Sequence, residues 1–312
     1  MNLDGSKIVV LYIIGYGHSG STFLDTVLGN HKNIEGVGEL CNLHGYAWQD
    51  GNLCACGEKA NKCKFWSAIR QEWIRRCRVE NIDEYLEMQQ TYDNWKSPGC
   101  WYRLSNEKKR QSYRFRIYSA RTRALFEAIA QVSGKSLIVD SSKNPTRAMA
   151  LSMMNGIDFR LIHLVRDGRG IIWSLLKRAA RVDQGSISTY KKWKIVLRAA
   201  LAWTIVNSQA EILRKGLGPE KSIFVRYEDF SNHPVKILNK IGAFIGVDLS
   251  PLGYELENGK SMKIGHTIAG NRLRMKESVK LEPDFEWKRN LLKGYENVFE
   301  ILGGWLLHRY GY

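Results

Sequence analysis

The sequence has no apolar run of the ~18–20 residues that a membrane-spanning helix needs. Its first residues, MNLDGSK, include Asp4 and lack the basic segment with which a signal peptide begins. Internal repeats and low-complexity tracts are also absent from the chain. We therefore expect a protein of the cytoplasm, for which attachment to the surface of a membrane remains open.

Acidic residues are scarce relative to basic ones. The 31 Asp and Glu residues are outnumbered by 47 Lys and Arg residues, so the formal net charge is +16 at pH 7. Such an imbalance indicates an anionic ligand, an acidic substrate, nucleic acid or an anionic membrane surface. The 312 residues, 44% of them apolar, suffice for one large α/β domain with insertions or for two domains.

The stretch from Lys7 to Asn30 organises the rest of the chain. An apolar, β-branched run over residues 8–14 predicts a strand that is buried on both faces. Gly15, Gly17 and Gly20 follow it, and apolar residues at helical spacing come next. A strand, a glycine loop and a helix place backbone N–H groups and a helix N-terminus around a phosphate. The plain alternative is a glycine-rich connection without a ligand.

The glycine loop lacks the lysine of a nucleoside-triphosphate site. From Gly15 the chain reads GYGHSGST, and Ser21 stands where the P-loop pattern has the lysine that holds the β- and γ-phosphates. The missing lysine indicates a ligand with a single phosphate-like group at this end. His18 is then the basic candidate in the loop.

Strands alternate with helices along most of the chain, which predicts a parallel sheet covered on both sides. Further buried strands are expected at 136–140, 159–165 and 222–226, and one long basic helix at 105–131. Ligands of such sheets bind at the carboxyl ends of the strands. The polar segments 15–22, 140–144 and 166–169 follow three of these strands and should converge. We expect a P-loop-like, three-layer α/β/α fold over residues 1–312, with a mostly helical insertion near 41–133 that shapes part of the ligand site.

Three of the six cysteines lie close together in the segment CACGEKANKCKFW. Cys54, Cys56 and Cys63 are candidates for a zinc site, with Cys41 or His44 as a fourth ligand. They are also compatible with a redox pair or with small buried apolar residues. The spacing is not the usual paired C-x-x-C, and we expect reduced cysteines in a cytoplasmic protein.

Several motifs together resemble the sulfotransferases that use 3′-phosphoadenosine 5′-phosphosulfate (PAPS), most of all the bacterial and tyrosylprotein branch. The segment from Gly17 to Thr22 resembles the family's 5′-phosphosulfate loop, and VRDGRGIIWS, with Arg166 eight residues before Ser174, resembles its 3′-phosphate site. The YED from Tyr227, the C-x-C-G…C-x-F-W segment and the H-x-x-x-G-N-x-x-R from His266 to Arg274 also look like this branch. The resemblance implies these donor-binding residues: Gly17, His18, Ser19, Gly20, Ser21, Thr22, Arg166, Ser174, Tyr227, Asn271 and Arg274.

The same resemblance implies in-line sulfuryl transfer to an acceptor hydroxyl, which leaves adenosine 3′,5′-bisphosphate (PAP). Glu39 would be the base, and Lys143 and His18 would stabilise charge on the leaving group. His18 departs from the family's usual Arg or Lys, so activity should fall as pH rises through its pKa if the imidazolium is needed. The resemblance requires no metal. A carbohydrate, a lipid headgroup, a phenol or a peptide tyrosine remains open as the acceptor.

Three other functions remain open. A P-loop kinase or nucleotide hydrolase would bind ATP and magnesium, but the loop lysine and an obvious Walker B carboxylate are missing. A basic nucleic-acid-binding protein without catalysis would leave Glu39 and the convergent loops unexplained, and we expect no specific nucleic-acid partner. A sulfotransferase fold that binds nucleotide without chemistry is the third.

Overall fold

The computed structural model describes residues 8–78, 82–183, 185 and 187–312, so Lys7 and Asp4 lie outside the described residues. Its centre is a five-stranded sheet in the order β2-β3-β1-β4-β5, with every neighbouring pair parallel. The strands are β1 (Ile8–Ile14), β2 (Ile34–Gly38), β3 (Leu137–Lys143), β4 (Ile157–Val165) and β5 (Ser222–Arg226). The expected parallel sheet is confirmed.

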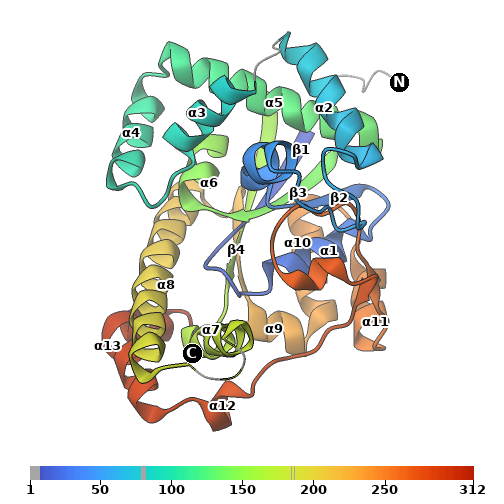
Figure 1. The fold of residues 1–312 in the computed structure, drawn as a ribbon. Coiled ribbons are helices and arrows are strands. Elements are labelled where there is room, and N and C mark those ends of the chain that lie inside the picture. The colour runs from blue at the N-terminus through green and yellow to red at the C-terminus, as the bar shows by residue number, and fades with distance from the viewer. Residues whose placement is uncertain (1–7, 79–81, 184, 186) are drawn as a thin grey trace.

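Helices cover both faces of the sheet because its central strand is apolar on both sides. Val10, Tyr12 and Ile14 of β1 belong to one core cluster with α5 (Tyr113–Ser133) and α6 (Pro145–Ser152). Leu11 and Ile13 point the other way, into a cluster with α1 (Ser21–Gly29), α10 (Pro234–Ile245) and α11 (Ser250–Glu257). The arrangement is the expected α/β/α fold of three layers (Figure 1).

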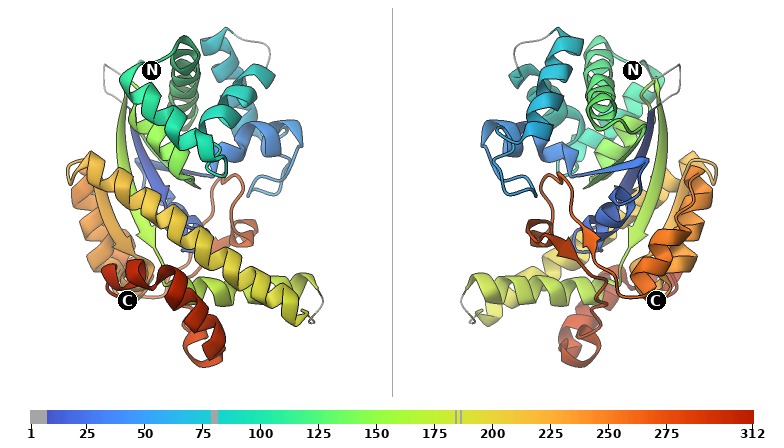
Figure 2. Two further views of the ribbon diagram at one scale, coloured as in Figure 1. Left: turned by 90° about the vertical axis from the view of Figure 1, so that its left-hand side faces the viewer. Right: turned by 90° about the vertical axis from the view of Figure 1, so that its right-hand side faces the viewer.

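A third core cluster lies at the carboxyl end of the sheet. It joins α7 (Gly168–Val182), α8 (Thr189–Leu217), α12 (Trp287–Asn290) and α13 (Lys293–Arg309). Figure 2 shows α8 as a long yellow helix that crosses one side of the molecule. A short helix, α9 (Tyr227–Asn232), follows β5 directly. No helix in the described ranges combines the length and the apolar character that crossing a membrane requires.

The expected insertion forms the upper part of the molecule in Figure 1. It contains a 3-10 turn (Leu40–Asn42), a π-helix (Leu43–Gln49), α2 (Lys64–Cys77), α3 (Asp83–Tyr92), α4 (Pro98–Lys109) and α5. The prediction of one helix over 105–131 is wrong, because α4 ends at Lys109 and α5 starts at Tyr113. Ser112 caps α5 by accepting from the Phe115 N–H at 3.2 Å, while its own N–H donates to Glu107 at 2.7 Å.

A long loop near the C-terminus reaches back to β2. Residues 264–276 (hereafter the return loop) lie between the short strands β6 (Met262–Lys263) and β7 (Ser278–Val279) and include a 3-10 turn (Arg272–Met275). The Ile268 N–H donates to the Val37 carbonyl at 3.0 Å, and the Glu39 N–H donates to the Ile268 carbonyl at 2.8 Å. The return loop therefore extends the sheet locally at the point where β2 ends.

Candidate active site

The glycine loop connects β1 to the N-terminus of α1, and two of its glycines lie very close to neighbouring elements. A Cβ on Gly15, whose φ is +150°, would lie 2.2 Å from the Leu164 carbonyl oxygen of β4. A Cβ on Gly20, whose φ is +85°, would lie 2.6 Å from the Tyr227 ring. Only glycine fits these close approaches without a shift. The first N–H groups of α1 and its dipole thus lie beside the loop and form a site suited to an anion.

His18, Arg166 and Ser174 meet at this loop. The His18 Nδ1 and the Ser174 Oγ share a hydrogen bond of 2.9 Å, and the Arg166 Nη1 donates to the His18 carbonyl at 3.2 Å. They come from three segments: the glycine loop, the end of β4 and the second turn of α7. The expected convergence of the first and third polar segments is therefore present.

Arg166 is almost buried, and its Nη2 forms an ion pair with the Asp284 carboxylate at 3.4 Å. Its Nη2 donates to the Asp284 carbonyl at 2.9 Å, and its guanidinium lies 4.7 Å from the centroid of the Tyr227 ring. Its Nε has no hydrogen-bond partner among the described residues. A buried guanidinium with an unused N–H can still bind an anion, because Arg presents several donors in a fixed plane. Tyr227 therefore contributes a ring surface beneath this cation.

His18 is a neutral imidazole at physiological pH in the ligand-free protein. Burial lowers its pKa from 6.5 to about 4, and the nearby Arg178, Arg166 and Lys143 lower it further in the same direction. The backbone of His18 is left-handed, with φ of +68°, which holds the ring beside Ser174. This value belongs to the ligand-free protein, and the fall of activity as pH rises through the pKa of His18 in the donor complex stays a prediction.

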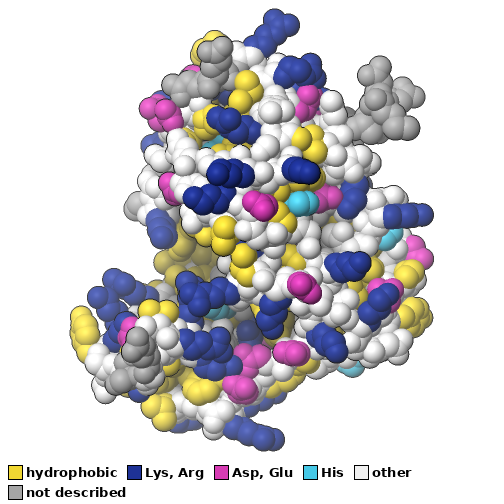
Figure 3. Space-filling model, turned by 45° about the vertical axis from the view of Figure 1, so that its right-hand side comes forward, with side chains coloured by type: hydrophobic (Ala, Val, Ile, Leu, Met, Phe, Trp, Pro, Cys, Tyr) yellow, Lys and Arg dark blue, Asp and Glu magenta, His cyan; other side chains and the backbone are white. Residues whose placement is uncertain are grey.

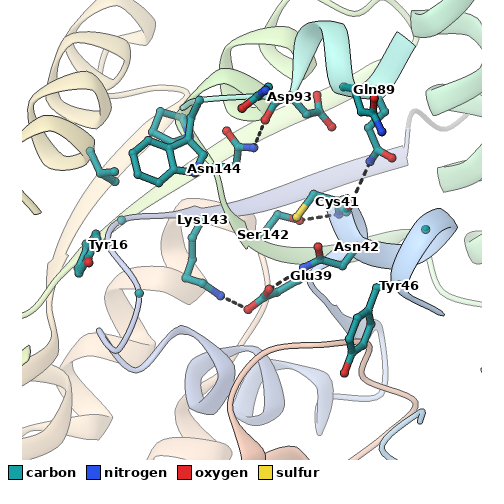
Figure 4. A pocket seen from close by; sticks show the side chains of 18 of the residues that line it. Tyr16, Glu39, Cys41, Asn42, Tyr46, Gln89, Asp93, Ser142, Lys143 and Asn144 are labelled. Carbon is teal, nitrogen blue, oxygen red and sulfur yellow. Dashed lines mark hydrogen bonds and ion pairs between the residues drawn. The ribbon is translucent and has the colours of Figure 1, made fainter. Parts of the chain in front are cut away.

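Glu39 and Lys143 form an ion pair at the ends of two adjacent strands (Figure 4). The second carboxylate oxygen of Glu39 accepts from the Asn42 Nδ2 at 2.8 Å, and the Lys143 Nζ also donates to the Ser141 carbonyl at 3.1 Å. Their side chains are 16% and 18% exposed. A carboxylate and an ammonium group held in this way can serve as a base and a charge-stabilising donor.

A cavity of about 520 Å³ opens beside this pair. Glu39, Lys143 and Gly17 line its floor, and the insertion supplies much of its wall. The wall residues include Tyr46, Leu86, Gln89, Trp95 and, from α8, Val206. Figure 4 shows Glu39 and Lys143 pointing toward one another, with Tyr16 and Tyr46 at opposite ends of the group. The cavity thus combines apolar surface with a few polar groups, as small-molecule sites do.

Two buried carboxylates that the sequence analysis did not identify hold this region in place. Asp25 accepts the Gly38 N–H at 3.0 Å, next to Glu39, and burial raises its pKa to about 7. Asp93 at the end of α3 pairs with Arg147 at 2.8 Å, and Arg147 also pairs with Asp140 at 3.0 Å. Each of these contacts joins two different elements of the fold, and Asp93 and Arg147 are 54 positions apart in the chain.

The return loop covers the start of α1 through its backbone. The Asn271 N–H donates to the Thr22 Oγ1 at 3.3 Å, whereas the Asn271 side chain accepts from the Leu273 N–H at 3.1 Å. Arg274 is buried and donates to the Leu53 carbonyl at 2.8 Å. Of the two residues, Asn271 is therefore the one that contacts the glycine-loop region in the ligand-free protein.

The cysteine cluster has a different fourth member from the two that we expected. Cys54, Cys56 and Cys63 gather around His266 of the return loop. Cys41 instead donates its N–H to the Ser142 Oγ at 3.0 Å, and the His44 ring packs edge-on against Trp73, at a centroid distance of 4.8 Å. Local spacing favoured Cys41 and His44, but the tertiary fold brings in a residue more than 200 positions away.

Comparisons with known proteins agree with this geometry. Residues 11–251 match the sulfotransferase family. The sulfotransferase domain from the curacin biosynthetic pathway is similar in fold, with 18% identity, coverage of 97% of this chain and 99% of that chain, and a TM-score of 0.51. A sulfotransferase from Mycobacterium avium covers 98% of this chain at 12% identity, with 78% of its own chain matched and a TM-score of 0.51.

A comparison with curated protein sequences finds no match. The family match spans the glycine loop, Glu39, Lys143, Arg166 and Ser174, and it does not favour the kinase and nucleic-acid alternatives. The resemblance that the motifs indicated is confirmed at the level of family, fold and class of enzyme. This chain belongs to the sulfotransferase family and is a sulfuryl-transferring enzyme.

Proposed function

We propose that this enzyme takes its sulfuryl group from PAPS and passes it to the hydroxyl of an acceptor in the cavity beside Glu39. The meeting of His18, Arg166 and Ser174 at the glycine loop carries the proposal. This arrangement places the Arg166 cation, the Ser174 hydroxyl and the His18 imidazole beside a helix N-terminus. Two phosphate groups of one nucleotide need such positive charge and hydrogen-bond donors. The ion pair of Glu39 and Lys143 lies in the adjoining cavity.

In this proposal the glycine loop holds the 5′-phosphosulfate of the donor. Backbone N–H groups from Gly17 to Thr22 and the side chains of Ser19, Ser21 and Thr22 surround the anion. Arg166 and Ser174 hold the 3′-phosphate. Tyr227 supports Arg166 from below, and the backbone at Asn271 closes the site over Thr22. Arg274 would join the donor site only after leaving the Leu53 carbonyl.

Glu39 accepts the proton of the acceptor hydroxyl as its oxygen attacks the sulfur atom. A new S–O bond forms, while the bond between sulfur and the bridging oxygen of the donor breaks on the opposite side. The electron pair stays on that bridging oxygen, which becomes part of the 5′-phosphate of PAP. Lys143 and the loop N–H groups stabilise the charge that grows there, and His18 donates one hydrogen bond as a neutral imidazole.

The acceptor is a hydroxyl-bearing molecule that reaches Glu39 through the cavity. Tyr46, Leu86 and Trp95 offer apolar surface to its body, and Gln89 offers a polar contact. A carbohydrate, a lipid headgroup, a phenol and a peptide tyrosine all carry the required hydroxyl. The insertion at 41–133 supplies most of these contacts, so we propose that it determines the choice of acceptor.

We propose that the enzyme works in the cytoplasm, at or near an anionic membrane surface. All six cysteines lie in the described part of the chain and none is in a disulfide, as in a reducing compartment. The net charge of +16 favours anionic surfaces. Figure 3 shows Lys and Arg side chains spread over one face of the molecule, with several beside a hollow.

Calorimetric binding of PAP tests the donor site, with ATP–Mg²⁺ as the comparison ligand. We expect PAP to bind and ATP–Mg²⁺ to bind far more weakly. Arg166→Ala should weaken PAP binding by roughly 10- to 100-fold, the range of a hydrogen-bonded charge. Arg198→Ala, at an exposed position of α8, is the control and should bind as the wild type does. A preference for ATP, or an unchanged affinity in Arg166→Ala, would overturn the proposal.

A further inference from the structure

Three cysteines that are close in the sequence and one distant histidine bring four metal-binding side chains together beside the return loop. Cys54 and Cys56 lie in a tight hairpin, where the Cys54 N–H donates to the Glu58 carbonyl at 2.9 Å. Cys63 is the N-cap residue of α2, and His266 belongs to the return loop. One nitrogen or sulfur atom from each of the four residues lies within 4.8 Å of the others.

Three of the separations are close to those between ligands that share one tetrahedral ion. The Sγ atoms of Cys56 and Cys63 are 3.7 Å apart, and the His266 Nδ1 lies 3.7 Å from the Cys54 Sγ and 3.3 Å from the Cys63 Sγ. Zinc bonds of about 2.3 Å to sulfur and about 2.1 Å to nitrogen give tetrahedral edges of roughly 3.6–3.8 Å. We propose that Cys54, Cys56, Cys63 and His266 bind one zinc ion.

The backbone around the cluster is arranged to support such an ion. Gly57, with φ of +89°, lets the hairpin turn so that both its thiols face Cys63. Because Cys63 caps α2, its thiolate lies at the positive end of the helix dipole. A disulfide between Cys56 and Cys63 would use two of the four groups and leave Cys54 and His266 without a role.

Two aromatic residues hold the imidazole of His266 in place. The Phe65 ring stacks on it at a centroid distance of 4.8 Å and an angle of 15°, and the Trp66 Nε1 donates to the His266 carbonyl at 2.7 Å. The stacked ring thus fixes the plane of the imidazole, and the indole N–H fixes the backbone that carries it. The proposed site thus explains the whole C-x-C-G…C-x-F-W segment, which the sulfuryl-transfer machinery does not use.

Four protein ligands leave no position for a substrate, so the ion is structural. It fastens the return loop to the cysteine hairpin, a link that the Ala55 N–H reinforces by donating to the Thr267 carbonyl at 3.1 Å. The next residue, Ile268, accepts the Glu39 N–H at 2.8 Å. The zinc site itself is independent of the proposed function. The further inference that the zinc site helps to position Glu39 as the base rests on that function.

Metal analysis of the full-length wild-type protein, purified under reducing conditions, tests the site directly. We expect one zinc per chain by elemental mass spectrometry. Replacement by cobalt should give the intense visible absorption of a tetrahedral ion and a thiolate-to-cobalt charge-transfer band. A folded chain that takes up no zinc on reconstitution, or a cobalt spectrum of six-coordinate oxygen type, would overturn the proposal. These measurements need neither donor nor acceptor, so they stand apart from any failure of the sulfuryl-transfer proposal.

Matched cysteine variants locate the ligands. Cys56→Ser, at an exposed position, should lose most of the bound metal and the cobalt charge-transfer band while the chain remains folded. His266→Ala should do the same. Cys77→Ser, at a half-buried cysteine of α2 outside the cluster, is the control and should keep one zinc per chain. Full zinc content in both Cys56→Ser and His266→Ala would show that the metal lies elsewhere.

Discussion

Glu39 sits where three constraints on its position meet. Its N–H is held by the return loop, its carboxylate pairs with Lys143, and the preceding Gly38 N–H is held by Asp25. A carboxylate fixed from several sides is suited to accept a proton in one orientation, since a general base must lie within hydrogen-bond reach of its substrate. In the proposed mechanism these contacts fix the side chain without the donor, so a change at Glu39 should affect proton transfer more than donor binding.

Glu39→Gln should lower kcat by roughly 10²- to 10⁴-fold, the range of general acid–base catalysis. PAP affinity should change little, because glutamine keeps the size of the side chain but cannot take up the proton. The measurement is transfer of labelled sulfate from PAPS to a panel of a phenol, a sugar and a tyrosine peptide. Glu35→Gln, on the strand β2 that ends just before Glu39 and paired with Lys135 at 2.9 Å, is the control and should keep its kcat. Wild-type turnover in Glu39→Gln would remove Glu39 as the base.

His44→Phe should make the protein less sensitive to acid. Burial lowers the pKa of His44 from 6.5 to about 3, and within the described part of the chain neither ring nitrogen has a hydrogen-bond partner. As pH falls from about 6.5 toward 3, the unfolded chain takes up a proton that the folded protein refuses, so the free energy of unfolding falls. Phenylalanine removes this loss. Urea unfolding at pH 7.5 and 5 should therefore show a smaller difference in the variant.

A second buried histidine, whose pKa burial also lowers, differs from His44 in having a hydrogen-bond partner. His163 is fully buried, but its Nε2 and the Asn207 Oδ1 share a hydrogen bond of 3.1 Å. His163→Phe would leave the buried Asn207 oxygen unpaired, which should destabilise the protein by about 1–3 kcal/mol at pH 7.5. If His44→Phe and His163→Phe lost equal stability at pH 7.5, the proposed difference between an unpaired and a hydrogen-bonded buried histidine would be contradicted.

At the scale of elements, the best predicted parts are those whose cause is local. Neighbouring residues determine the order of β1, glycine loop and α1, which the sequence predicts correctly. The same is true of the eight-residue spacing that places Arg166 after β4 and Ser174 in α7. The break between α4 and α5 was missed because residues 105–131 are uniformly helical in pattern. The boundary between the two helices is marked by two hydrogen bonds of Ser112, which donates its N–H to Glu107 and accepts the N–H of Phe115.

Contacts between distant elements explain what the sequence could not predict about the site. The hydrogen bond of His18 with Ser174 joins residues 156 positions apart, and the cluster around His266 joins segments more than 200 positions apart. The low pKa of His18 likewise arises from burial and from three cations of other elements. Residue types and spacing indicate the chemistry, whereas the partners and protonation states depend on the tertiary fold.

At the scale of the whole molecule, the surface of α8 remains apolar after the core is complete. Exposed apolar residues recur at about every fourth position along the helix: Trp193, Leu197, Leu201, Ile205 and Ile212. Exposed Lys191, Lys194 and Arg198 lie in its first three turns. An apolar row beside basic side chains is typical of a helix that lies on an anionic membrane. Figure 2 shows the helix that carries both features crossing one side of the molecule.

Sedimentation with lipid vesicles checks the proposed attachment. The protein should bind vesicles that contain phosphatidylglycerol, bind pure phosphatidylcholine vesicles much less, and lose binding as salt is raised, because salt screens the attraction between basic side chains and the surface. Leu201→Glu should reduce binding several-fold, since it adds a negative charge to the apolar row. Tyr102→Glu, at a 71% exposed position of α4 away from that row, adds the same charge and should bind as the wild type does. Equal loss in both variants would assign the attraction to net charge alone, and no binding at low salt would exclude α8 as a membrane-facing surface.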